Sequence, residues 1–142
     1  MKGKLANYIT IGTNNLERAK NFYDELFCDL HVKSFKPNER SVFWTIPGDD
    51  TMFAVFVPYD GEEASAGNGN MTGFTMKTEE DVNNLYEKAI SLGAIDEGAP
   101  GQRATGFYGG YVRVLDGNTL TFCKFGSVSY THLRAHETAY PL

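Results

Sequence analysis

The sequence predicts an α+β protein built from two tandem βαβββ modules. An alternating strand pattern followed directly by an amphipathic helix pattern occurs twice, and strand-like runs follow each helix. In addition, residues 74–78 repeat residues 9–13 at an offset of 65, with apolar residues and threonines in the same places. We expect module one at about residues 5–58, a polar linker at 59–70 and module two at 71–126.

The first module opens with alternating apolar and polar residues at 8–13, which is typical of a half-buried strand. Asn14, with Glu17 three residues on, is predicted to cap a helix whose apolar stripe ends near Cys28. Cys28 is expected in the core. Turns rich in Pro, Gly, Asn and Asp then separate three predicted strands, at 32–35, 41–46 and 51–57.

The second module repeats this order. Its first strand is predicted at 74–78, Thr78 with Asp81 is predicted to cap its helix, and Gly93 to end it. A weakly marked strand is expected at 94–98. Two further strands are predicted at 107–114 and 119–125, joined by a turn at 115–118.

Each helix is expected to cover the outer face of its sheet, so that the other faces line a cleft shared by the two modules. Positions expected under the helices are Ile9, Ile11, Phe74, Met76, Leu120 and Phe122. Positions expected in the cleft are Tyr8, Thr10, Thr75, Thr121 and Cys123.

Composition excludes several classes of partner. The chain of 142 residues has 13 Lys and Arg against 18 Asp and Glu, a net charge of −5, which disfavours nucleic acid and anionic membranes. No apolar run is long enough to span a bilayer, and the pattern of a signal peptide is missing. With two cysteines only, a cytoplasmic location is expected.

Only three histidines are present. His31 follows the first helix and is expected to be a solvated loop residue. His132 and His136 have the spacing of some zinc sites, but Leu133 stands where that motif carries its general base. Residues 127–142 are interpreted as a non-native tail, because 128–138 resembles an in-frame read-through of a sequencing-library adapter, and the domain is expected to span 1–126.

Residues 8–27 resemble the opening strand and helix of the vicinal oxygen chelate superfamily, which includes glyoxalase I, bleomycin resistance proteins and extradiol dioxygenases. Residues 96–101, 107–113 and 116–118 are similar to the second module of a bacterial glyoxalase-like branch, although Val114-Leu115 stands where that branch usually has Asp-Pro. The resemblance spans about residues 5–126 and implies a cleft between paired modules. In the enzymes of the superfamily it also implies a divalent metal held by four side chains.

The resemblance places the metal ligands on the first and last strands of each module. Those positions are Tyr8, Gly73, Thr121 and one residue within Phe53–Phe56. None offers the imidazole or carboxylate that divalent ions prefer. No cofactor is therefore predicted, and a divalent metal is expected only if its ligands lie elsewhere.

Further candidates for the cleft come from the middle strand and the second-module motif. Trp44 suits either the core or a pocket wall, and Tyr108 and Tyr111 offer flat rings with a hydroxyl. Arg103 and Arg113 suit an anionic or carbonyl-bearing ligand, the alternative being a surface pair with Asp116 or Glu97. Cys123 is either a thiolate nucleophile or a small apolar filler.

These observations predict a metal-free protein that binds a small, partly aromatic molecule, with a homodimer as a possible assembly. One alternative is an antibiotic-sequestering resistance protein. Another is an enzyme, either a metal-dependent lyase or dioxygenase with ligands not identified here, or one that uses Tyr8 or Tyr111 for acid-base chemistry. No catalytic residue is assigned.

Overall fold

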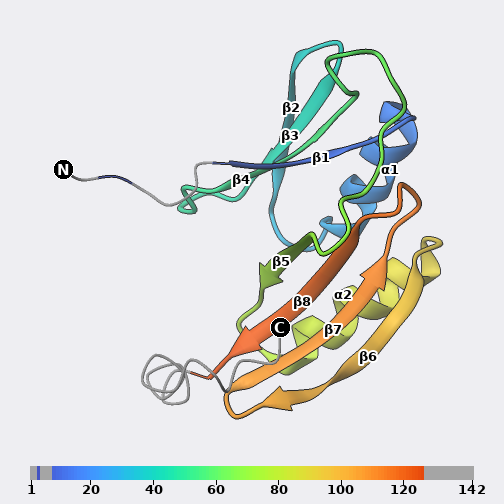
Figure 1. Ribbon diagram of the computed structural model, residues 1–142. Helices are drawn as coiled ribbons and strands as arrows, with labels where there is room; N and C mark the ends of the chain where they lie inside the picture. Colours follow the sequence, from blue (N-terminus) through green and yellow to red (C-terminus); the bar gives the residue numbers. More distant parts are fainter. Residues whose placement is uncertain (1–2, 4–7, 127–142) are drawn as a thin grey trace. The chain divides into compact units, whose positions relative to one another are not determined.

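The computed structural model describes Gly3 and residues 8–126 (Figure 1). The proposed tail, with His132 and His136, lies outside these residues. The chain divides into two compact units, residues 1–68 and 69–142. The cleft shared between modules stays a prediction.

Unit 1 contains one helix and a four-stranded mixed sheet. Its elements are β1 (Tyr8–Gly12), α1 (Leu16–Leu26), β2 (Lys33–Asn38), β3 (Ser41–Thr45) and β4 (Met52–Phe56). The strand order is β1-β4-β3-β2, in which β1 runs parallel to β4 and the other neighbours are antiparallel.

Unit 2 repeats this topology. Its elements are β5 (Met71–Thr75), α2 (Glu79–Ser91), β6 (Ile95–Ala104), β7 (Phe107–Arg113) and β8 (Thr119–Phe125). The strand order is β5-β8-β7-β6, again with one parallel pair, β5 and β8. The predicted α+β class with two βαβββ modules is confirmed. The weakly marked strand is ten residues long, because register shifts carry β6 past Gly98 and on to Ala104.

Asn15, not Asn14, caps α1. Its Oδ1 accepts a hydrogen bond from the backbone N–H of Arg18 at 3.0 Å, so the predicted cap was wrong by one residue. The side chain of Asn14 instead binds a distant segment, where its Oδ1 accepts from the N–H of Ala64 at 2.6 Å. Thr78 caps α2 as predicted, accepting from the N–H of Asp81 at 3.0 Å.

The two modules correspond at an offset of 63 residues, not 65. The caps Asn15 and Thr78 are 63 residues apart. So are the donors of two matching hydrogen bonds after the first strands, from Thr13 N–H to Phe56 O and from Met76 N–H to Cys123 O. A shift of two residues returns every side chain to the same face of a strand, so the sequence pattern could not separate the two offsets. β5 therefore begins at Met71, 63 residues after the start of β1, and not at residue 74 as predicted.

Aromatic side chains fill the core of unit 1 between α1 and the sheet. Tyr23 and Phe27 of α1 pack against Trp44 and Phe53, with ring centroids 4.9 to 6.4 Å apart. The indole N–H of Trp44 donates to Asp24 Oδ1 of α1 at 2.9 Å. Trp44 is therefore a core residue on the helix side of the sheet, which corrects its placement in the binding cleft.

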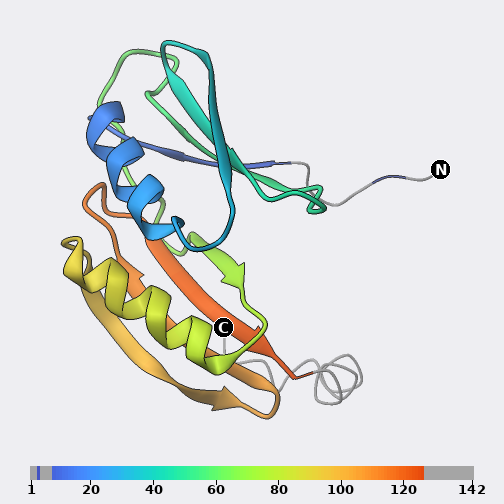
Figure 2. The same cartoon turned by 180° about the vertical axis from the view of Figure 1, so that it is seen from behind.

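The core of unit 2 lies between α2 and its sheet, and Figure 2 shows this helix in front of the strands. Val82, Leu85 and Ala89 of α2 are buried, as are Leu120 and Phe122 of β8, which confirms the last two as positions beneath a helix. Two other burial predictions were wrong, since Ile9 is 37 % exposed and Cys28 is exposed. Ile11, Phe74 and Met76 are half-buried.

Candidate functional site

The helix-free face of the unit 2 sheet gathers most of the predicted cleft residues. Tyr108 of β7 contacts α2, so its strand neighbours at odd positions point to the other face. Because Tyr111 lies opposite Thr121 and Gly109 opposite Cys123, β8 presents its own odd positions there as well. We call this face, made of Thr75, Arg103, Tyr111, Arg113, Thr121 and Cys123, the unit 2 surface.

A fixed cation lies against a phenol at the centre of the unit 2 surface. The Arg103 guanidinium carbon is 5.3 Å from the centroid of the Tyr111 ring. Its Nε donates to the carbonyl of Gly109 at 3.2 Å, and Nη2 donates to the carbonyl of Ala99. Two backbone acceptors therefore hold the guanidinium in place.

Gly98 makes room for this pair. Its φ is +153°, and a Cβ there would lie 3.0 Å from Tyr111 Cδ2 and 3.2 Å from Arg103 Nη2. Any side chain at this position would press on both groups. The absence of a side chain at Gly98, which lies opposite Tyr111 in the pairing of β6 and β7, thus allows arginine and tyrosine to stack.

Tyr111 is a hydrogen-bond donor at neutral pH. Burial raises the pKa of its phenol, the nearby Arg103 charge lowers that pKa, and Cys123 raises it again. Because the net shift is upward from about 10, the proton stays on the oxygen at neutral pH. As a hydrogen-bond donor, Tyr111 suits a carbonyl or anionic ligand.

Cys123 is held as a thiol, together with its neighbour Thr75. Burial raises the pKa of the Cys123 thiol, and the hydrogen bond with Thr75 Oγ1, at 3.9 Å, opposes this only in part. The thiol lies 3.8 Å from the carbonyl oxygen of Phe74, to which it donates. A nucleophilic cysteine requires a lowered pKa, so this geometry favours the apolar-filler interpretation.

Arg113 is paired at one end of the unit 2 surface. Its Nη2 lies 3.0 Å from Glu97 Oε2, and its Nη1 donates to the carbonyl of Gly117 at 2.7 Å. Thr119 Oγ1 donates to the second oxygen of Glu97 at 3.0 Å. The alternative of a surface pair with Glu97 is confirmed, and it leaves Arg103 as the better placed cation for a ligand.

Tyr108 was wrongly placed in the cleft. Its hydroxyl donates to Asn83 Oδ1 of α2 at 2.6 Å, so the ring lies on the helix side of the sheet. Tyr108 and Tyr111 are three residues apart on a strand whose pairing with β8 is uninterrupted, and they must point to opposite faces.

Tyr8 and Thr10 lie on the helix-free face of the unit 1 sheet. The Tyr8 ring is 5.8 Å from that of Phe43, which itself stacks on Phe35 and contacts Phe56. Sequence reasoning missed these three phenylalanines. The available signal was the alternation on β3, where Phe43 must face away from the buried Trp44.

A family model for the Glyoxalase/Bleomycin resistance protein/Dioxygenase superfamily matches residues 5–122. The chain belongs to this superfamily. Its sequence is also 28 % identical to that of a glyoxalase/bleomycin resistance protein from Albidiferax ferrireducens T118. The crystal structure of that protein matches ours with a TM-score of 0.78, over 87 % of this chain and 100 % of that one. No curated protein matched the sequence.

More distant structures share the fold of the superfamily. A glyoxalase-related enzyme from Fulvimarina pelagi is 21 % identical, with a TM-score of 0.68 over 85 % of this chain and 87 % of that one. A lactoylglutathione lyase from Agrobacterium tumefaciens is 19 % identical, with a TM-score of 0.65 over 87 % of this chain and 96 % of that one. Among the residues described in our structure, no helix is long and apolar enough to cross a membrane.

The residues at the superfamily's metal positions do not fit a divalent metal. Gly73 and Thr121 are direct partners across β5 and β8, and a Cβ on Gly73 would lie 3.2 Å from the methyl of Thr121. The Thr121 hydroxyl donates to the carbonyl of Gly110 at 3.0 Å. Neither a glycine nor a hydroxyl that already donates to a backbone carbonyl supplies the imidazole or carboxylate that such ions prefer.

The corresponding pair in unit 1 is no better suited. The 63-residue offset takes Gly73 to Thr10, and the register partner of Thr10 on β4 is Ala54, just as Thr121 is the partner of Gly73. Tyr8 pairs with Met52 and corresponds to Met71. This moves the first-strand position from Tyr8 to Thr10 and keeps the last-strand position within Phe53–Phe56. Across residues 3 and 8–126, no group of three or more His, Cys, Asp or Glu side chains is placed to hold a metal ion.

Proposed function

We propose that this chain is a small-molecule-binding member of the superfamily and that its ligand contacts the unit 2 surface without the divalent metal of the family's enzymes. The observation that carries the proposal is the fixed pair of Arg103 and Tyr111 on the face that α2 leaves uncovered. An arginine oriented by two backbone carbonyls loses little side-chain entropy when it binds an anion.

The chemistry of this pair indicates the kind of ligand. A guanidinium suits a carboxylate or carbonyl oxygen, the Tyr111 hydroxyl is a second donor, and its ring offers flat apolar area. The hydroxyl of Thr121 and the thiol of Cys123 already donate to backbone carbonyls nearby. We therefore propose a small carbonyl-bearing or anionic compound as the ligand.

A binding screen tests the proposal. Small carboxylates, dicarbonyls and antibiotic-like compounds are added to purified protein and the melting temperature is recorded, because a ligand that prefers the native state must raise it. The best compound is then titrated by calorimetry against wild type, Arg103→Gln and Tyr111→Phe. Lys88→Gln on α2 serves as the charge-matched control.

We expect Arg103→Gln to weaken binding about 10- to 100-fold, as for a lost charge-assisted hydrogen bond, and Tyr111→Phe to weaken it less. Lys88→Gln should bind as wild type does. A screen in which no compound raises the melting temperature would overturn the binding proposal. Stoichiometric metal in the purified protein, with binding lost on chelation, would overturn its metal-free part and favour a metal-dependent lyase or dioxygenase.

A further inference from the structure

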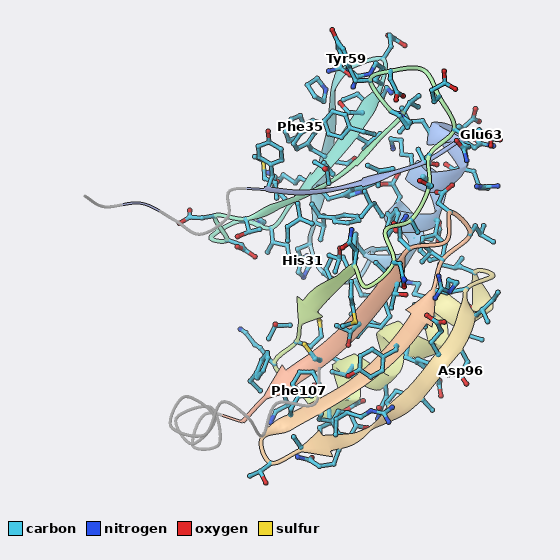
Figure 3. The ribbon with its side chains drawn as sticks, viewed as in Figure 1. His31, Phe35, Tyr59, Glu63, Asp96 and Phe107 are labelled. Carbon is cyan, nitrogen blue, oxygen red and sulfur yellow. The ribbon has the colours of Figure 1, made fainter. Side chains whose placement is uncertain are left out.

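The segment that follows β4 is anchored to unit 1 at Ala64. The side-chain amide of Asn14 makes two hydrogen bonds to this residue, donating to its carbonyl at 3.3 Å and accepting from its N–H at 2.6 Å. A Cβ on Gly12 would lie 3.0 Å from the Ala64 methyl, so the end of β1 also packs closely against it. Figure 3 labels the preceding residue, Glu63, beside α1. Residues 65–70 then lead from this anchor to β5.

Asn68 and Gly69 form an exposed turn in this remaining stretch, at the point where the chain divides into its two units. They are the only Asn-Gly pair in the sequence. The φ of Gly69 is +91°, and a Cβ there would meet no atom within 4 Å. Among the described residues, neither the Asn68 side chain nor the N–H of Gly69 has a hydrogen-bond partner. The two groups can therefore move against each other without breaking a contact.

This pair has the groups needed for cyclisation through the backbone. The amide nitrogen of Gly69, once it has lost its proton, attacks Cγ of Asn68, a C–N bond forms, and the side-chain nitrogen leaves as ammonia. Water then opens the resulting five-membered succinimide at one of its two carbonyls. Opening at Cγ gives aspartate, and opening at the main-chain carbonyl gives isoaspartate, in which the backbone runs through the side chain. In total, one water is consumed and one ammonia is released.

Two other turns of the structure show what opposes such an attack. Gly61 and Gly117 each follow an aspartate and have φ values of +76° and +89°. In each case the N–H of the glycine donates to the carbonyl three residues earlier, at 3.1 and 2.8 Å. A nitrogen held in this way must break its hydrogen bond before it can lose the proton and turn toward the side chain. Gly69 shares their positive φ but not their hydrogen bond.

We propose that Asn68 is a site of spontaneous deamidation, which converts the joint between the two units to aspartyl and isoaspartyl links. Water is the only co-reactant. One added carboxylate takes the formal net charge from −5 to −6, and isoaspartate lengthens the backbone of the joint by one carbon atom. The proposal goes beyond the proposed function, because it concerns the linker and holds whether or not either sheet binds a ligand.

Mass spectrometry tests the proposal. Purified protein is incubated at pH 7 and pH 9 in water enriched in heavy oxygen, so that each deamidated residue carries the label, and fragment spectra assign the residue. An isoaspartyl methyltransferase with a labelled methyl donor detects isoaspartate. Asn70 is the internal control, because it is exposed in the same stretch but is followed by methionine. Circular dichroism before and after incubation checks that the protein stays folded.

Two variants separate the groups that react. Gly69→Ala places a Cβ beside the attacking nitrogen, and Asn68→Gln lengthens the side chain so that a five-membered ring no longer forms. We expect Asn68 of wild type to deamidate at least about tenfold faster than Asn70, and each variant to lose about tenfold or more of the rate at residue 68. The rate in wild type should be higher at pH 9 than at pH 7, because the nitrogen must lose its proton.

Urea separates the effect of the folded structure from that of the dipeptide. In native protein, Asn68 should deamidate within about threefold of its rate in the urea-unfolded chain, because no contact holds it. Isoaspartate formation at Asp116, which precedes the hydrogen-bonded Gly117, should be at least about tenfold slower in native protein than in urea.

Three results would overturn the proposal. The first is a native rate at Asn68 that falls below the expected range of the urea rate, since a contact would then hold the joint. The second is equal deamidation of Asn68 and Asn70 in native protein. The third is Gly69→Ala protein that deamidates at Asn68 as fast as wild type, which would exclude attack by an uncovered glycine nitrogen.

Discussion

The indole N–H of Trp44 on β3 donates to Asp24 Oδ1 on α1 at 2.9 Å, and this bond joins the sheet of unit 1 to its helix. The other oxygen of Asp24 pairs with Lys20 at 2.5 Å, one turn earlier on the same helix. Asp24 therefore has two partners, one at a buried indole and one near the surface. Stability should depend mainly on the first.

Asp24→Ala should lower the free energy of unfolding by about 1 to 3 kcal/mol, because it leaves the buried indole donor without an acceptor. Asp24→Asn keeps an acceptor oxygen and should cost less. Lys20→Gln, which removes only the ion pair between half-exposed side chains, should cost about 0.5 kcal/mol or less. Urea unfolding followed by fluorescence measures all three, since Trp44 is the only tryptophan. A Lys20→Gln loss as large as that of Asp24→Ala would contradict this ranking.

The identity of the helix cap makes a second prediction. Asn15→Ala should destabilise the protein by about 1 kcal/mol, because the N–H of Arg18 loses its acceptor, whereas Asn15→Asp, also a good cap, should be close to neutral. Urea midpoints of the three proteins measure this. An Asn15→Ala midpoint equal to that of wild type would show that the cap contributes little.

Most of the fold was predictable because its signals are local. Alternation along β8 placed Thr121 and Cys123 on one face. The same rule applied to β7 would have put Tyr108 and Tyr111 on opposite faces. Thr78 was recognised as a cap since its partner, the N–H of Asp81, lies only three residues on.

The remaining features depend on contacts between residues far apart in the chain. Trp44 finds its acceptor 20 residues away on α1, and Asn14 binds Ala64 across 50 residues. No local pattern distinguishes a core indole from a pocket wall, or the capping asparagine from its neighbour. The Arg103 and Tyr111 pair likewise depends on the missing side chain at Gly98, whose position opposite Tyr111 sequence periodicity does not reveal.

The two cysteines should differ widely in reactivity. Cys28 is exposed, whereas Cys123 is buried with a raised pKa, and neither forms a disulfide. Native protein treated with Ellman's reagent at pH 8 should release one equivalent of thionitrobenzoate quickly and the second slowly, because the thiolate is the reacting form. Cys28→Ser should remove the fast phase, and urea should make the second thiol react quickly. A fast phase that persists in Cys28→Ser would show that Cys123 is an accessible thiolate.

Alkaline pH should weaken the folded state through Tyr111. Its folded pKa is raised above the unfolded value of about 10, chiefly by burial, so the unfolded chain releases the proton first. The stabilising contribution is fully present below pH 10 and is lost as the pH rises through the folded pKa. The free energy of unfolding of wild type should therefore fall above pH 10.

In Tyr111→Phe the free energy of unfolding should fall less steeply with pH, and the difference in slope should correspond to at most one proton. The fall should not vanish, because the pKa of Tyr86 is also raised in the folded state, mainly by its hydrogen bond to Asp96. Arg103→Gln removes the charge that lowers the pKa of Tyr111, so its alkaline fall should extend to higher pH than that of wild type, whatever its stability at neutral pH. Urea unfolding at pH 8 to 11 measures these slopes. Parallel curves for wild type and Tyr111→Phe would show that the phenol titrates alike in both states, and would contradict a pKa of Tyr111 raised by burial on the unit 2 surface.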